Sequence, residues 1–129
     1  PYNELVFNLR ASYYLETEAL VDNFVKQGYK KIGVFYQVDA YGRDGWQGIK
    51  KALQKYDLSI AAEATYRRGA KFTDSFSRQA GYFLKQKVDA IICIASYQAA
   101  AGFIRDVRDI NFNVPIANIS FVDPEAMGE

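Results

Sequence analysis

The sequence contains no histidine, and this absence excludes several kinds of chemistry at once. A Ser-His or Cys-His catalytic pair cannot be built, and neither can a metal site with imidazole ligands. Cysteine is nearly absent too, since Cys93 is the only one and no disulfide can form within the chain. Cys93 lies in the apolar run AIICIAS, so we expect a buried structural thiol. These absences weaken the case for an enzyme.

Strong net charge and long apolar runs are also missing. Sixteen basic residues against fifteen acidic ones give a net charge of +1, and the Lys and Arg residues are scattered. Nucleic acid is therefore not an expected partner. No run of eighteen apolar residues and no signal-peptide pattern is present, so no membrane span is predicted. With 129 residues, 50% of them apolar, the chain can bury one core without metals or disulfides.

Short apolar runs alternate with helical patterns along the chain, which predicts right-handed crossovers between parallel strands. We therefore expect an α/β fold: a doubly wound, mostly parallel sheet with helices on both faces, forming a single lobe over residues 1–129. The expected extended segments are 5–10, 30–37, 59–66, 88–96 and 114–121. The expected helices are 15–27, the stretch after Asp39, the stretch opened by Thr73 or Asp74 as N-cap, and the stretch around 100–107.

Apolar residues at helical spacing indicate which faces these helices bury. Gly28 is expected to end the first helix. The expected stripes are Leu20, Val21, Phe24 and Val25; then Trp46, Ile49 and Leu53; then Phe76, Ala80, Phe83 and Leu84; and finally Ala100, Phe103, Ile104 and Val107.

Three glycines spaced by three residues (Gly42, Gly45, Gly48) follow an apolar strand and suggest a phosphate loop. The pattern lacks the Lys-Ser/Thr ending of a Walker A loop and is not G-x-G-x-x-G. Asp39 and Asp44 would also place negative charge where a phosphate should bind. We therefore expect Asp39 to cap the helix, and Gly45 and Gly48 to allow close packing of the helix on the sheet.

Ligands of open parallel sheets bind at the carboxyl ends of the strands, which directs attention to the loops found there. A phospho-acceptor receiver domain would need an aspartate after the central strand, where this chain has Ala95 and Ser96. A flavin site would need a hydroxyl-rich loop after the first strand, and QVDAYG is not one. The loops in question are 37–45, 66–74, 95–102 and 120–125, with 10–17 as a fifth if the first strand points to the same edge.

The order and spacing of three motifs resemble the type I periplasmic binding proteins of the branched-chain amino-acid (Leu/Ile/Val) class. These motifs are D-x-Y-G at 39–42, a glycine followed by T-D-x-F at 69–76, and V-D-A-I at 88–91. The segment VFNLRASYYLETEAL resembles the crossing from the first lobe of this family to the second.

The resemblance implies two α/β lobes joined by a hinge, which close over a small solute and deliver it to the membrane permease of an ABC importer. This chain would be an excised fragment, most of the second lobe, from a periplasmic or extracellular protein without catalysis, metal or cofactor. Its partners would be the solute, the missing first lobe and the permease. The lone lobe is expected to self-associate through exposed apolar surface and sheet edges.

The resemblance also implies a set of ligand-binding residues. Tyr41 matches the aromatic residue of the Y-G turn, and Tyr97 matches the tyrosine after the central strand. The set we predict is Arg10, Tyr13, Asp39, Tyr41, Ser96, Tyr97, Ser120 and Phe121.

Two departures from the family pattern bear on the ligand. The carboxylate that amino-acid binders offer to the ligand's ammonium would fall on Ser120, Phe121 or Val122, with Asp123 next, and its absence weighs against an α-amino acid. Arg10 would suit a carboxylate ligand, with a structural ion pair to Glu16 or Glu18 as the alternative. The expected solute is therefore a carboxylate-bearing or aromatic metabolite, with an amino acid still open. Two alternatives to a transport protein remain open: a receptor or sensor of the same fold, and an enzyme of flavodoxin-like fold.

Overall fold

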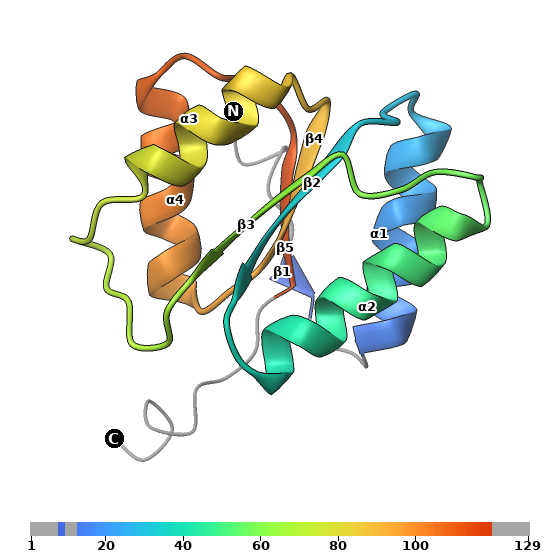
Figure 1. Cartoon of the computed structure of the whole chain (residues 1–129), viewed down its shortest axis with the longest axis horizontal. Coiled ribbons are helices and arrows are strands. Elements are labelled where there is room, and N and C mark those ends of the chain that lie inside the picture. Colours follow the sequence, from blue (N-terminus) through green and yellow to red (C-terminus); the bar gives the residue numbers. More distant parts are fainter. Residues whose placement is uncertain (1–7, 10–12, 120–129) are drawn as a thin grey trace.

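Strands and helices alternate throughout the part of the chain that the structure describes (Figure 1). This computed structural model describes the backbone of residues 8–9 and 13–119 and the side chains of residues 17–119. The elements are β1 (Asn8–Leu9), α1 (Tyr13–Lys26), β2 (Ile32–Gln37), α2 (Ala40–Gln54), β3 (Ala62–Tyr66), α3 (Ser77–Gln86), β4 (Ala90–Ile94), α4 (Tyr97–Asp109) and β5 (Ile116–Ile119). None of the described helices is both long enough and apolar enough to cross a bilayer.

The five described strands form one sheet in the order β1-β5-β4-β2-β3, and every neighbouring pair is parallel. Phe35 of β2 pairs with Ala64 of β3 on one side and with Cys93 of β4 on the other. From β2 the chain first builds outward to β3 and then returns to lay β4 on the opposite side of β2. The strand order therefore reverses between β2 and β4, and the predicted doubly wound parallel sheet is confirmed.

Helices α1 and α2 cover one face of the sheet and α3 and α4 cover the other (Figure 1). Successive residues of β4 alternate between the two apolar clusters, with Ile92 and Ile94 on the α1/α2 side and Ile91 and Cys93 on the α3/α4 side. Because both faces are covered, the central strand is apolar along its whole length. Cys93 is fully buried as expected, and burial raises the pKa of its thiol.

The four described helices end in the same way, with a residue of positive φ within three residues of the last helical residue. That residue donates its N–H to a carbonyl three residues back, and the next residue donates to a carbonyl five residues back, which is the Schellman arrangement. The predicted end of α1 at Gly28 is confirmed, and Tyr29 packs edge-on against Phe24 across it at 5.8 Å. The positive-φ residues are Gly28, Asp57, Lys87 and Asn111.

All three glycines in α2 allow close approach, but of the two that were expected to pack on the sheet only Gly45 does so. A Cβ on Gly45 would lie 2.8 Å from Ile94 of β4, as the expected packing requires. A Cβ on Gly48 would instead overlap Thr17 of α1, so the expectation for Gly48 was wrong. Gly48 lets the two helices on this face approach each other.

The start and one face of α3 also differ from expectation. The helix begins at Ser77 with Phe76 as N-cap, whereas Thr73 or Asp74 was predicted to cap it. Asp74 instead closes a turn by accepting the Lys71 N–H at 2.8 Å. Leu84, predicted to be buried with Phe83, is 42% exposed because α3 turns only a narrow stripe to the sheet.

Candidate functional site

At the carboxyl edge of the sheet, the starts of α2 and α4 lie on either side of the reversal of strand order. Helix α2 follows β2 and α4 follows β4, and these two strands are neighbours that lead to helices on opposite faces of the sheet. Both helices start at the same edge of the molecule (Figure 1). A crevice between such helix starts is where open parallel sheets bind small molecules. Strand β1 is parallel to β5, so its carboxyl end points to this edge too.

At the start of α2, Asp39 is the N-cap, as predicted. Its Oδ1 accepts the Gly42 N–H at 3.0 Å, and its Oδ2 accepts a hydrogen bond from Gln37 Nε2. Gly42 is required here, because a Cβ would overlap the backbone carbonyl oxygen of Gln37. Tyr41, in the same turn, is 42% exposed. The Asp39 carboxylate, which was expected near the ligand, therefore accepts hydrogen bonds from two groups within the protein.

The start of α4 has a similar construction. The hydroxyl of Ser96 caps the helix by accepting the Ala99 N–H at 3.3 Å. The following residue, Tyr97, is 58% exposed, more than any other large hydrophobic side chain in the described part of the chain. Ser96 thus orients the helix turn that carries Tyr97.

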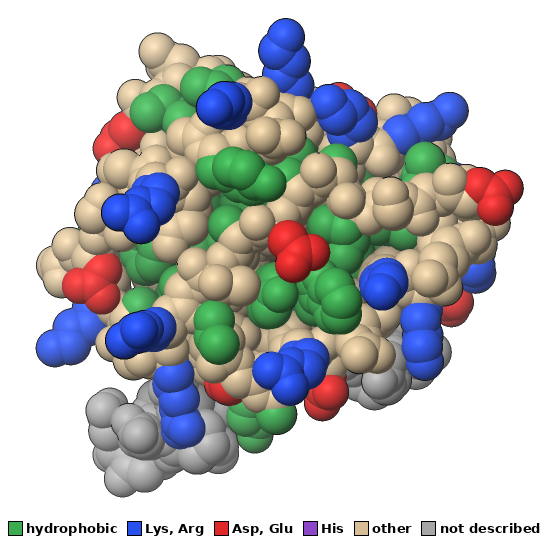
Figure 2. Space-filling model, in the orientation of Figure 1, with side chains coloured by type: hydrophobic (Ala, Val, Ile, Leu, Met, Phe, Trp, Pro, Cys, Tyr) green, Lys and Arg blue, Asp and Glu red, His purple; other side chains and the backbone are tan. Residues whose placement is uncertain are grey.

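Exposed hydrophobic side chains gather at this edge. Val38 and Tyr41 follow β2 and Tyr97 follows β4, while the exposed Phe72 lies beside a later part of α4, with its ring centroid 4.7 Å from the Arg105 guanidinium. Basic side chains, by contrast, are spread around the margin of the face shown in Figure 2 and form no stripe there. Apolar and aromatic surface with a few polar groups is the usual lining of a small-molecule site.

A buried polar chain runs beneath the two helix starts. The Tyr66 hydroxyl donates to Gln37 Oε1 at 2.9 Å and accepts the Ser96 N–H at 3.0 Å. Tyr66 and Gln37 are both buried, and burial raises the pKa of Tyr66 to about 12. Sequence reasoning missed both residues. The only signal was that each ends a strand on the edge where the site was expected.

An open groove of about 560 Å³ lies beside the end of β3. Its lining includes Val38, Tyr66, Phe76, Gln79 and the basic segment 67–70. The groove shares Val38 and Tyr66 with the carboxyl edge. Its lining does not include Tyr41 or Tyr97, the two residues called the cleft tyrosines below. It therefore extends the candidate site toward the β3 edge, and its guanidinium groups would favour a carboxylate there.

Helix α4 holds the loop that forms one wall of this groove. The Phe76 N–H donates to Asp106 at 2.6 Å, and Arg105 donates to the carbonyls of Phe72 at 2.5 Å and Asp74 at 2.8 Å. The Arg105 hydrogen bond also lowers the pKa of Asp106. Asp106 thus accepts the N–H of Phe76, the N-cap of α3, whose own side chain makes no capping hydrogen bond.

The remaining predicted site residues cannot be placed in the same detail. Arg10, Ser120 and Phe121 lie outside the described residues. Tyr13 is the first residue of α1, and its side chain lies outside the described part. Among the described residues, no three Asp, Glu or Cys side chains are grouped so that they could hold a metal ion.

A parallel sheet with two helices on each face matches the lobe of a periplasmic substrate-binding protein. The sequence model of the family described as "Periplasmic binding protein" matches residues 1–128. The chain therefore belongs to the periplasmic binding protein family, a family of solute-binding proteins without enzymatic activity.

Solved structures agree with this assignment. A substrate-binding periplasmic protein from Ralstonia solanacearum is 30% identical, with a TM-score of 0.80, over 94% of this chain and 33% of that one. A "possible leucine/isoleucine/valine-binding protein" from Rhodopirellula baltica is 32% identical, with a TM-score of 0.76, over 94% of this chain and 34% of that one. The recognised resemblance to the Leu/Ile/Val class is confirmed.

More distant structures share the fold alone. The solute binding protein of an ABC transporter from R. palustris, solved in complex with benzoate, is 20% identical with a TM-score of 0.73. It matches over 83% of this chain and 29% of its own. The chain thus spans about a third of the length of these relatives. A search of curated proteins found no match.

Proposed function

We propose that this chain is the second lobe of a periplasmic or extracellular solute-binding protein that delivers a small molecule to an ABC importer. The observation that carries the proposal is the pair of exposed tyrosines, Tyr41 and Tyr97, on helix starts that flank the reversal of strand order. Family membership supports the solute-binding role, and relatives named as ABC solute-binding proteins support the link to a permease. The lobe itself performs no catalysis in this proposal.

The proposed solute is small and carries an aromatic ring or a carboxylate. Two tyrosine rings offer flat apolar surface with polar tips, which suits a planar molecule. Arg67 and Arg68 in the neighbouring groove suit a carboxylate. The benzoate complex of the R. palustris protein is a precedent for such a ligand on this fold. The other lobe would supply the second half of the cleft.

Thermal unfolding of the two-lobed protein that contains this chain tests the proposal. The probes are benzoate, leucine, isoleucine, valine and short-chain organic acids. A true ligand at a hundred times its Kd stabilises the protein by about 2.7 kcal/mol, which raises Tm measurably. No rise with any of these probes would contradict the proposed ligand class.

Matched tyrosine variants place the binding at this edge. Tyr97→Ala and Tyr41→Ala should reduce the ligand-induced rise in Tm. Tyr82→Ala should preserve it, because Tyr82 is 41% exposed, much like Tyr41, but lies in the middle of α3. An equal loss in all three variants would move the site away from the two cleft tyrosines.

A further inference from the structure

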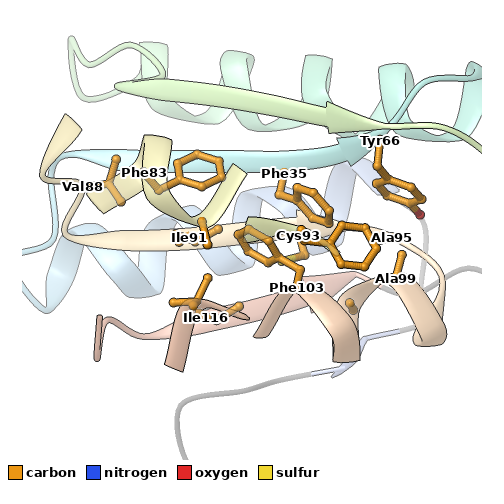
Figure 3. Packing of buried hydrophobic residues seen from close by; sticks show 14 of the residues in the cluster. Phe35, Tyr66, Phe83, Val88, Ile91, Cys93, Ala95, Ala99, Phe103 and Ile116 are labelled. Carbon is orange, nitrogen blue, oxygen red and sulfur yellow. The ribbon is translucent and has the colours of Figure 1, made fainter. Parts of the chain in front are cut away.

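Tyr66 occupies an unusual place for a residue on an edge strand. It ends β3, whose residues Glu63 and Thr65 are exposed, yet its own side chain is only 6% exposed. The ring stacks on Phe35 at 5.1 Å and meets Phe76 edge-on at 6.1 Å. Figure 3 shows it at the end of the aromatic row, near Ala95 and Ala99 of the β4–α4 connection. The ring therefore carries its hydroxyl from the sheet edge toward the point where strand order reverses.

The hydroxyl joins two elements that are not consecutive in the chain. It donates to Gln37 Oε1 at the end of β2 and accepts the N–H of Ser96 at the start of α4. The backbone carbonyl of Tyr66 also accepts the Val38 N–H at 2.9 Å. Tyr66 thus forms hydrogen bonds with the residues at the ends of both β2 and β4.

The charge of Asp39 sets the direction of every bond in this chain. A carboxylate only accepts hydrogen bonds, so the amide nitrogen of Gln37 must face Asp39 and the amide oxygen must face Tyr66. The Tyr66 hydroxyl must then donate to Gln37, which leaves its lone pairs for the N–H of Ser96. The raised pKa keeps the hydroxyl protonated, as this arrangement requires.

The chain ends at the first turn of each cleft helix. Asp39 accepts from the Gly42 N–H in the turn that carries Tyr41. Ser96 accepts from the Ala99 N–H in the turn that carries Tyr97. A change in the Tyr66 hydroxyl would therefore reach both turns.

We propose that Tyr66 is a positioning residue that fixes the start of α2 relative to the start of α4, and through them the spacing of the two cleft tyrosines. The proposal rests on the proposed function for its meaning in ligand binding. Its physical content, the coupling of two helix starts through one hydroxyl, does not depend on any ligand.

Amide hydrogen exchange and NMR of the 129-residue chain test the coupling. Tyr66→Phe keeps the ring but leaves the Ser96 N–H and Gln37 Oε1 without their partner. We expect protection at Ser96, Ala99 and Gly42 to fall about tenfold, with central amides of β2 and β4 unchanged. The ring resonances of Tyr41 and Tyr97 should shift as well, which a purely local packing role would not cause.

Tyr56→Phe is the matched control. It removes a tyrosine hydroxyl that donates to Asp22 at 2.5 Å between α2 and α1, away from the cleft edge. None of the cleft signals should move in this variant. A uniform loss of protection in Tyr66→Phe, or unchanged ring resonances of both cleft tyrosines, would overturn the proposal.

A second variant keeps the test informative if Tyr66→Phe does not fold. Gln37→Met cuts the chain between Tyr66 and α2 but spares the bond to Ser96. Protection should then fall at Gly42 and persist at Ser96, and equal loss at both would again overturn the proposal. Because no ligand is added, failure here is distinct from failure of the solute screen.

Discussion

At Gly42, the absence of a Cβ atom allows the chain to turn from β2 into α2. The first turn of α2 passes so close to the end of β2 that a Cβ at position 42 would overlap the carbonyl oxygen of Gln37. Gly81 lies within α3 and has nothing within 4 Å of its own missing Cβ. A side chain can therefore be added at Gly81 without a clash, but not at Gly42.

We expect Gly42→Ala and Gly81→Ala to change stability in opposite directions. Gly42→Ala should lower the free energy of unfolding by about 1–3 kcal/mol, because backbone must shift to admit the methyl group. Gly81→Ala should raise it by up to about 1 kcal/mol, because alanine restricts the unfolded chain and favours helix. Urea unfolding followed by circular dichroism measures both. Similar values for the two variants would show that the approach at Gly42 is not tight.

Roles that depend on neighbouring residues could be predicted from the sequence, but contacts between residues distant in sequence could not. Asp39 as a helix cap follows from its place before a helical stretch, and the structure confirms it. The role of Tyr66 depends on Ser96, thirty residues later, and on a strand order that no local pattern encodes. A tyrosine at a strand end reads equally well as a surface residue.

At the scale of elements, α3 departs from local rules at both its start and its end. The end of α1 at Gly28 was predicted because glycine commonly ends helices, whereas Lys87 adopts φ of 57° against its intrinsic preference. The start of α3 was mispredicted because Asp106 of α4 supplies the acceptor from thirty residues away. An acceptor on another helix leaves no mark in the local sequence.

Lys87→Gly should therefore stabilise the protein. Glycine adopts the left-handed conformation without the Cβ penalty, and we expect a gain of about 1 kcal/mol in the free energy of unfolding. The reverse change, Gly28→Ala, should cost a similar amount, because it puts a Cβ into a φ of 95°. Chemical denaturation of both variants checks the pair. A loss of stability in Lys87→Gly would mean that the lysine side chain contributes more than the strain it imposes.

At the scale of the whole molecule, the β3 edge of the sheet and its carboxyl edge expose different kinds of side chain. The β3 edge carries Glu63, which accepts hydrogen bonds from Trp46 at 3.0 Å and Tyr36 at 3.4 Å, and the side chain of Gln79 occupies the Thr65 carbonyl oxygen at 3.1 Å. A charged residue and an occupied carbonyl oppose strand addition at that edge. Among the described residues, the carboxyl edge instead exposes the apolar surface of Val38, Tyr41 and Tyr97.

We therefore expect the lone lobe to self-associate through its carboxyl edge, the surface that the other lobe would face in the proposed protein. Light scattering and sedimentation over concentrations up to about 1 mM should show a weak dimer, since a small apolar patch gives only modest affinity. Tyr97→Asp should weaken the dimer about tenfold, because it places charge in the contact while remaining compatible with the N-terminus of α4. Tyr82→Asp is the matched control and should leave association unchanged, because Tyr82 lies away from the carboxyl edge. A monomer throughout the concentration range, or equal weakening by both variants, would contradict association through this edge.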